Sequence, residues 1–344
     1  MWRSPPDPLH FEPMTADRSS ALSITRRSWL GAAAALALPS AHAQTTDLSA
    51  LTLHAAKYKG GDDLLLDAAK LRATPYKLEY GEFGSGNLIV EAINAGSIDI
   101  GSMSEIPPIF AAISGAKIRI VAVLLGDTNN QVVLVPKGSA VQRIADLKGK
   151  RVGYVRATTT HYYLTRMLED AGLSFADITP VALNPADGRA AFDRGNIDAW
   201  AIYGYSVPLT IAATGARVLV TAKGYLSGNY VYAARKEALD DPKLSAAIGE
   251  YLARVNRAYD WQQRSLDAWA EIQGKALDVP PAIVRDLLKN ATQRSRLVPI
   301  RDEHVASAKQ VADLFARVGV TPRKVDMAPL FDRRYGELLA RSAA

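Results

Sequence analysis

Hydrophobic and polar positions along the chain change their spacing in a regular order, which predicts strands that alternate with helices. Residues 76–83 alternate apolar and polar side chains, as half-buried strands do, whereas 62–71 repeat apolar side chains at helical spacing. The pattern predicts strands at 51–55, 76–83 and 98–102, with helices at 62–71 and 87–94. Strands and helices in alternation favour parallel pairing through right-handed crossovers, so this segment predicts an open α/β sheet.

The same unit occurs a second time later in the chain. Residues 92–99 recur 99 residues on, at 191–198, with the small, apolar, glycine and Ile-Asp positions in register. Each copy is typical of a helix that ends at a glycine and turns tightly into a strand. We therefore expect two similar lobes. The flanking pattern repeats as well, with strands expected at 151–155, 178–183 and 197–203 and helices at 161–171 and 187–194.

Two short apolar segments, 131–136 and 229–235, are expected to be the strands at which the chain enters and leaves the second copy. Two crossings between two lobes make a hinge, which suits lobes that close on a ligand. The predicted fold class is α/β, with two lobes that are each an open, mostly parallel sheet flanked by helices. We assign 44–130 and 236–344 to the first lobe and 131–235, hinge strands included, to the second.

The chain after this return is predicted to be mostly helical, at about 242–274, 280–292 and 302–318. Its large apolar side chains are expected to pack against the first lobe rather than to carry function; they are Trp261, Trp269, Leu287 and Phe315.

The first 43 residues have the features of an export signal. Arg26 and Arg27 precede an apolar residue pair and a weakly hydrophobic, alanine-rich stretch at 31–38. Small residues at Ala41 and Ala43 suit a signal peptidase, so cleavage is expected before Gln44. The segment resembles a twin-arginine leader of bacteria, with a buried N-terminal helix as the alternative. Either Met1 or Met14 could be the start. The predicted product is periplasmic.

Composition narrows the function. The 344 residues include 41 basic and 35 acidic side chains, a net charge of +6. The two signs are interspersed without a basic run of five, which argues against a nucleic-acid partner. No cysteine is present, which excludes thiol nucleophiles, iron–sulfur clusters and disulfides. The five histidines have no metal-ligand spacing, and no nucleotide or hydrolase motif occurs. We expect a binding protein with no metal, cofactor or catalysis.

The candidate ligand-binding residues lie where predicted strands end. Ligands of open α/β sheets bind at the carboxyl ends of strands, where glycines allow close approach and helix N-termini favour small anions. The alternatives left open are plain helix caps for Ser85 and Thr158–Thr160, a solvated Lys57 and a partly exposed helix start for His161. The candidates are Lys57, Tyr58, Gly84, Ser85, Gly86, Asn87, Ser102, Ser104 and Glu105 in the first lobe, and Arg156, Thr158, Thr159, Thr160, His161, Tyr203 and Tyr205 in the second.

Several segments resemble the aliphatic-sulfonate-binding proteins of ABC importers. They are 98–110, 145–152, 160–164, 187–200, 298–300 and 311–315, and the resemblance covers most of 50–325. It implies a two-lobed periplasmic receptor of type II-like fold, a monomer that binds a small sulfonate anion and delivers it to an ABC permease. By position, Ser102, Ser104 and Glu105 would match first-lobe ligand contacts. The anion-side loop of the second lobe would be matched by Arg156, Thr159, Thr160 and His161.

Two loops depart from the pattern of that family. The chain has Tyr203-Gly204-Tyr205 where the family commonly has Trp-Asp-Pro, and the loop 57–61 also differs. Tyr58, Tyr203 and Tyr205 could form an apolar wall for an alkyl or aryl tail. Taurine, nitrate or a thiamine-precursor-like ligand remain alternatives. An alternative of another class is a desulfinase-like enzyme on the same fold, which the missing cysteine nucleophile disfavours.

Overall fold

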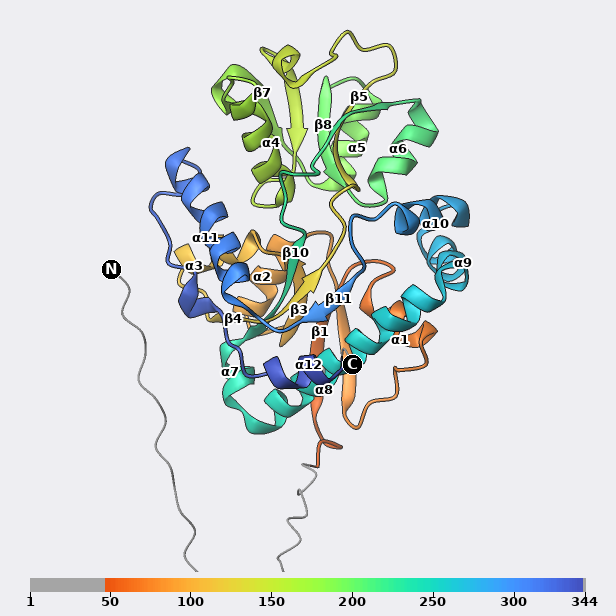
Figure 1. Ribbon diagram of the computed structural model, residues 1–344, viewed down its shortest axis with the longest axis vertical. Helices are drawn as coiled ribbons and strands as arrows, with labels where there is room; N and C mark the ends of the chain where they lie inside the picture. The colour runs from red at the N-terminus through yellow and green to blue at the C-terminus, as the bar shows by residue number, and fades with distance from the viewer. Residues whose placement is uncertain (1–46, 343–344) are drawn as a thin grey trace, which may run out of the picture. The chain divides into compact units, whose positions relative to one another are not determined.

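The structure, a computed structural model, describes residues 47–342 and contains two β-sheets, each flanked by helices (Figure 1). The predicted signal segment lies outside these residues. We call each sheet with its helices a lobe, and the predicted α/β class with two lobes is confirmed. Among the described helices, none combines the length and the apolar character that a bilayer crossing requires.

The first sheet has six strands in the order β11-β4-β10-β3-β1-β2, and four of them run in one direction because β10 and β11 are antiparallel to their neighbours. Its strands are β1 (Thr52–Lys57), β2 (Lys77–Glu82), β3 (Ile100–Ser104), β4 (Ile118–Leu125), β10 (Asn229–Arg235) and β11 (Arg296–Val298). The connecting helices are α1 (Asp62–Ala68), α2 (Gly86–Asn94) and α3 (Pro107–Ile113).

The second sheet has five strands in the order β7-β6-β8-β5-β9, with β5 antiparallel to both of its neighbours. Its strands are β5 (Gln131–Val135), β6 (Arg151–Tyr154), β7 (Thr179–Ala182), β8 (Ala199–Tyr203) and β9 (Arg217–Thr221). The helices of this lobe are α4 (Thr159–Asp170), α5 (Pro185–Asp193) and α6 (Ser206–Thr214), with short 3-10 turns at Ile144–Leu147 and Phe175–Asp177.

The hinge strand β10 belongs to the first sheet, which corrects our assignment of 229–235 to the second lobe. It pairs antiparallel with β3 on one side and with β4 on the other. A short apolar strand at the hinge fits either sheet by its own pattern, and only these long-range ladders decide between them. The two crossings are therefore the chain after β4, at 126–130, and the chain between β9 and β10.

The sequence repeat has a structural basis in both sheets. Asp99 donates its backbone N–H to the His54 carbonyl (2.8 Å), and its side-chain Oδ2 accepts from the His54 N–H (3.0 Å). Asp198 bonds Arg151 in the same way, at 2.8 Å in both bonds. Each aspartate thus fixes the strand that follows its helix against the first strand of its own unit, where main-chain pairing alone is short.

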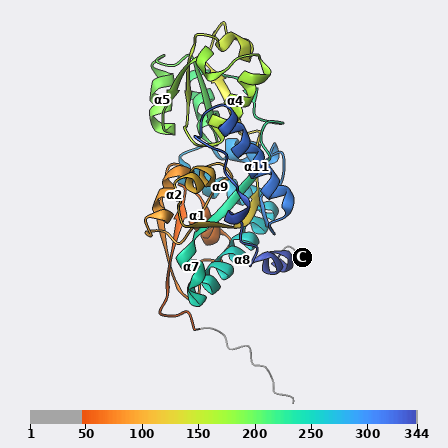
Figure 2. The same cartoon turned by 90° about the vertical axis from the view of Figure 1, so that its left-hand side faces the viewer.

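The chain after β10, residues 236–342, which we call the tail, covers the first sheet with helices. Its elements are α7 (Lys236–Asp240), α8 (Pro242–Arg264), α9 (Leu266–Leu277), α10 (Pro281–Lys289), α11 (Asp302–Arg317) and α12 (Gly336–Ser342), with a 3-10 turn at Ala328–Leu330. The helix predicted at 242–274 is two helices, because the backbone of Ser265 leaves the helical region. Figure 2 shows α7, α8 and α11 around the first sheet from a second direction.

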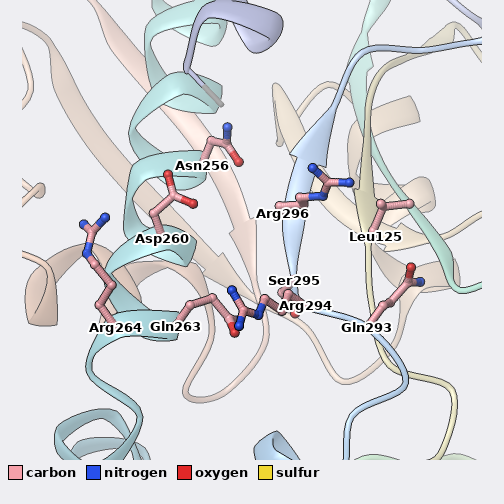
Figure 3. A pocket seen from close by; sticks show the side chains of 9 residues that line it. All are labelled: Leu125, Asn256, Asp260, Gln263, Arg264, Gln293, Arg294, Ser295 and Arg296. Atoms are coloured by element: carbon pink, nitrogen blue, oxygen red, sulfur yellow. The ribbon is translucent and has the colours of Figure 1, made fainter. Parts of the chain in front are cut away.

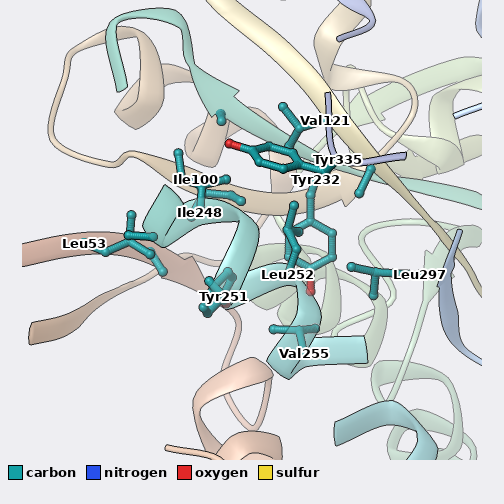
Figure 4. Close-up of a cluster of buried hydrophobic side chains, with 14 of the residues drawn as sticks. Leu53, Ile100, Val121, Tyr232, Ile248, Tyr251, Leu252, Val255, Leu297 and Tyr335 are labelled. Atoms are coloured by element: carbon teal, nitrogen blue, oxygen red, sulfur yellow. The ribbon is translucent and has the colours of Figure 1, made fainter. Parts of the chain in front are cut away.

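Helix α8 provides much of the first-lobe core. Ile248, Leu252 and Val255 are fully buried on one of its faces and pack with Leu53 of β1 and Leu297 of β11 (Figure 4). Trp261 and Trp269 join this cluster, and Phe315 of α11 lies in a second cluster of the same lobe. The predicted packing of these three aromatic residues against the first lobe is confirmed.

A buried carboxylate lies inside this core. Asp62, the first residue of α1, accepts hydrogen bonds at Oδ2 from the hydroxyls of Tyr232 (2.7 Å) and Tyr251 (3.1 Å). Desolvation raises the pKa of Asp62 to about 6, although these two hydrogen bonds act in the opposite direction. The bonds connect the start of α1, and so the loop after β1, to β10 and α8.

We expect Asp62→Asn to stabilise the protein at pH 7. The pKa of Asp62 is higher in the folded chain than its ordinary 3.8, so stability is lost as pH rises between about 4 and 6. The amide removes this cost, which is about 3 kcal/mol for a shift of roughly two pKa units, and still accepts from Tyr232. Urea unfolding from pH 4 to 7 measures the effect, with exposed Asp286→Asn as control. An unchanged pH slope in Asp62→Asn would contradict the assignment.

Candidate functional site

The loops at the strand ends of the two lobes lie against one another. Burial raises the pKa of the Tyr58 phenol, which follows β1, and the nearby phenols of Tyr203 and Tyr230 raise it further. Tyr203 ends β8, and its own pKa is raised by burial to about 12. Tyr58 of the first lobe and Tyr203 of the second are therefore close enough to influence each other, beside Tyr230 of hinge strand β10; the apolar wall proposed for them stays a prediction.

A glutamine of the tail bridges the same two lobes. Gln273 of α9 accepts a hydrogen bond at Oε1 from the Tyr205 hydroxyl, and its Nε2 donates to the Gly60 carbonyl at 2.9 Å. Tyr205 also packs with Leu209 of α6 against Ala270 and Val284 of α9 and α10. The Tyr205 hydroxyl is thus used to hold the lobes together, and this side chain is less available to a ligand than the sequence suggested.

At the start of α4, two threonine hydroxyls form hydrogen bonds that hold the turn, and a third, within the described residues, does not. Thr158 and Thr160 both donate to the Val155 carbonyl, at 2.8 and 3.0 Å, and Thr160 also accepts from the Val155 N–H at 2.8 Å. Within residues 47–342, the Thr159 hydroxyl has no hydrogen bond and exposed Arg156 has neither a hydrogen bond nor an ion pair. The helix has no side-chain N-cap, so its first amide N–H groups are left for another acceptor.

His161 lies in an aromatic contact between the lobes. Its ring centroid is 5.0 Å from Tyr154, 5.2 Å from Phe175 and 5.1 Å from Phe315 of the first lobe. Desolvation and the nearby Arg156 lower the pKa of His161 to about 4, so the ring is neutral near pH 7. Its Nδ1 accepts from the Ala157 N–H at 3.4 Å. The imidazole therefore supplies packing here and no positive charge.

The loop before α2 brings the backbone close to its neighbours. A Cβ on Gly86 would lie 2.8 Å from Cβ of Met103 and 3.1 Å from Cγ of Pro107, so only glycine fits. Ser85 occupies the N-cap position and is buried, yet its side chain does not cap the helix. Oδ1 of Asn87 is buried without a partner among the described residues, whereas Gly84 is exposed. The α2 N-terminus thus also has unused polar groups.

The end of β3 carries two half-buried serines and a buried glutamate. In the described part of the chain, the hydroxyls of Ser102 and Ser104 form no hydrogen bond with other side chains or with the backbone. Glu105 accepts at Oε1 from the hydroxyls of Ser227 (2.6 Å) and Ser307 (3.0 Å), while its buried Oε2 has no hydrogen bond within residues 47–342, although the Asn229 side chain is near enough to lower the pKa of the carboxyl. Desolvation raises the pKa of Glu105 to about 7, against the effect of these hydrogen bonds.

Lys57 is already neutralised by neighbouring carboxylates. Its Nζ lies 2.5 Å from Asp63 and 3.4 Å from Glu82, and the hydrogen bond to Asp63 raises the pKa of the lysine. Its charge is therefore less available to an anion than that of Arg156. Across residues 47–342, no group of three histidine, aspartate or glutamate side chains could hold a metal ion.

The model of the NMT1/THI5-like family matches residues 77–261, from β2 through most of α8. The chain belongs to this family. The matched part includes the candidate loops before α2, after β3, before α4 and after β8, but not the loop after β1.

The chain is also similar to several bacterial binding proteins. It is 35% identical to an aliphatic sulfonates-binding protein of Escherichia coli (strain K12) over 252 residues, 73% of this chain and 78% of that protein. The crystal structure of the periplasmic aliphatic sulphonate binding protein from Escherichia coli is 32% identical, with a TM-score of 0.71 over 80% of this chain and 90% of the other.

An alkanesulfonate-binding protein from Xanthomonas axonopodis pv. citri, bound to MOPS, is 30% identical, with a TM-score of 0.76 over 83% of this chain and 99% of that one. These likenesses confirm the predicted fold of a periplasmic binding protein and the predicted family resemblance. A desulfurization enzyme at 15% identity and a TM-score of 0.60, over 85% of this chain and 98% of the other, shares the fold alone.

Several residues of this region were missed by the sequence analysis. Gln273, Ser227 and Ser307 contact the candidate loops from α9, the hinge and α11. Tyr230 of β10 donates its hydroxyl to the Asp127 carbonyl at 3.0 Å and accepts from Gln131 at 2.7 Å. These residues follow no predicted strand end in the repeat, so the strand-end rule could not find them.

We expect Tyr205→Phe to lower the free energy of unfolding by about 1–2 kcal/mol, because Oε1 of buried Gln273 loses its donor. Chemical denaturation of the purified variant measures the loss. Tyr154→Phe is the matched control, since the Tyr154 hydroxyl makes no hydrogen bond within the described residues. Equal stability of the two variants would show that the bridge between the lobes contributes nothing.

Proposed function

We propose that this chain is a periplasmic solute-binding protein that captures a small organosulfonate anion between its lobes and delivers it to an ABC permease. The observation that carries the proposal is the start of α4, where an uncapped helix N-terminus adjoins Arg156 and the Thr159 hydroxyl, neither of which has a partner among residues 47–342. The sulfonate-binding relatives support the ligand class. Their periplasmic location supports export of this chain, for which the twin-arginine route remains our proposal.

A sulfonate head fits these groups chemically. Its three oxygens share one negative charge and accept hydrogen bonds from several directions. The first N–H groups of α4, its positive end and the Arg156 guanidinium supply donors and charge of the right sign. Hydrogen bonds to a charged group are about twice as strong as neutral ones, and Thr159 is buried whereas Arg156 is exposed.

The rest of the ligand would contact the first lobe. Tyr58 and Tyr203 offer aromatic faces to an alkyl or aryl tail, with their phenols in reach of polar substituents. On the same lobe, the hydroxyls of Ser85, Ser102 and Ser104 form no hydrogen bond with any other described residue. Gly84, Gly86 and Asn87 would present backbone and amide groups at the start of α2.

A second candidate is a sulfonate that carries an amine, such as taurine. The unpaired Oε2 of Glu105 favours it, because a buried carboxylate oxygen is costly unless it accepts a hydrogen bond or pairs with a cation. A ligand ammonium placed there would restore that partner and lower the pKa of Glu105.

We propose that binding is the whole activity and that the receptor is a monomer. The relatives above 30% identity are binding proteins, and the chain has no cysteine to act as the nucleophile of a desulfinase. Turnover of an aryl sulfinate by the purified protein would overturn this part of the proposal.

We expect Arg156→Ala to weaken sulfonate binding about 10- to 100-fold, because it removes a charge-assisted hydrogen bond worth about 1.5–3 kcal/mol. Lys59→Ala removes another exposed cation, from the loop after β1, that forms no ion pair within residues 47–342, and it should change the affinity less than about twofold. Isothermal titration calorimetry compares the two variants. Equal, small losses of affinity in the two variants would contradict the role proposed for Arg156.

Thermal unfolding against a ligand panel tests the ligand class. The panel contains short and long alkanesulfonates, MOPS, taurine, aryl sulfonates, nitrate, sulfate and thiamine precursors. A ligand at 100 times its Kd adds about 2.7 kcal/mol to stability, which raises the Tm by several degrees. We expect shifts with sulfonates and none with nitrate. A shift with taurine that Glu105→Gln abolishes would favour the second candidate, and a flat panel from folded protein would contradict both.

A further inference from the structure

A cavity of about 480 Å³ lies on the first lobe between α8 and the segment that leads into β11 (Figure 3). None of the candidate ligand-binding residues lines it. Asn256, Asp260 and Arg264 are spaced four residues apart along α8, so they share one face of the helix. Facing them are Gln293, Arg294, Ser295 and Arg296, with Leu125 of β4 at the side.

Three arginines around this cavity have no carboxylate partner among the described residues. Arg264, Arg294 and Arg296 take part in none of the ion pairs found among residues 47–342, although most other surface arginines of the tail have a carboxylate partner. Asp260 is the single acidic residue of the lining, so the four charged groups sum to +2. Arg264, Arg294 and Arg296 are exposed, so water and salt screen much of their mutual repulsion, and an anion bound in the cavity would lower what remains.

Hydrogen bonds to residues outside the cavity hold two of its lining side chains, Asn256 and Gln293. Asn256 is buried, accepts at Oδ1 from the Leu297 N–H (2.8 Å) and donates from Nδ2 to Ser342 (3.0 Å). Gln293 donates from Nε2 to the carbonyls of Gly126 (2.8 Å) and Gly228 (3.3 Å), one in each hinge crossing. These bonds hold the segment 293–297 against α8 and the hinge, so the backbone around the cavity needs no rearrangement when a ligand binds.

Asp260 is the one carboxylate among the residues that line the cavity. We propose that this cavity binds a phosphate group that retains a P–OH, either inorganic phosphate or a phosphomonoester. Guanidinium groups match phosphate oxygens in geometry and charge, and a volume of about 480 Å³ also accommodates a small ester. The P–OH donates to Asp260, a bond that the fully ionised sulfate ion cannot form. The inference is independent of the sulfonate site.

Calorimetric titration of the purified protein at pH 5.5 tests the site, with inorganic phosphate, glycerol 3-phosphate and sulfate at matched ionic strength. We expect saturable phosphate binding that is stronger than sulfate binding. The double variant Arg294→Gln/Arg296→Gln should lose about tenfold or more in phosphate affinity. Arg257→Gln, exposed on α8 outside the cavity, is the matched control and should change it less than about twofold. Asp260→Asn should remove the preference for phosphate over sulfate.

Equal binding of phosphate and sulfate by the native protein, or an equal loss in the Arg257→Gln control, would overturn the proposal. So would a loss on Arg156→Ala, which would place phosphate between the lobes instead. Tighter binding of glycerol 3-phosphate identifies an ester as the ligand, and tighter binding of inorganic phosphate identifies the free ion; both support the site.

Discussion

The contacts of Gln273 constrain the rest of the region between the lobes. One side chain of the tail holds Tyr205 of the second lobe and the Gly60 carbonyl of the first. Helix α6 packs on α9 and α10 beside it, while α4 contacts α11 through His161 and Phe315. The second lobe thus rests on tail helices on two flanks as well as on the hinge. These contacts hold the loops after β1 and β8 and the start of α4 in place relative to the tail.

Polar groups at the strand ends divide into those that build the loops and those that remain unused. Hydrogen bonds within the protein already occupy the hydroxyls of Thr158, Thr160 and Tyr205. The ammonium group of Lys57 forms an ion pair with Asp63. The side chains of Arg156, Thr159 and the serines of β3 form no such bonds within the described residues. A ligand can gain most from groups that give up no internal bond, because an exchanged bond adds little free energy.

The sequence analysis correctly predicted those elements that are determined by residues close together in the chain. Residues 92–99 and 191–198 share a glycine in the left-handed region and an aspartate that binds its neighbouring strand, and both features can be recognised from short patterns. The sheet of β10 and the partners of Glu105 depend on residues far away in the chain, and no local pattern marked the break at Ser265. Thr158 and Thr159 are alike in sequence, and only the turn geometry separates a structural hydroxyl from a free one.

The insertion of β10 between β3 and β4 has a consequence for biosynthesis. All five strands of the second lobe lie within 131–221, so this lobe can fold as soon as that stretch has left the ribosome. The first lobe, although begun earlier, stays an incomplete sheet until β10 and the core face of α8 have been made. A nascent or truncated chain that stops before residue 229 keeps β3 and β4 as open edges, which invite pairing with other chains. Chaperones that hold unfolded segments would therefore bind the first-lobe segment 52–125, which is synthesised first, rather than the second lobe at 131–221.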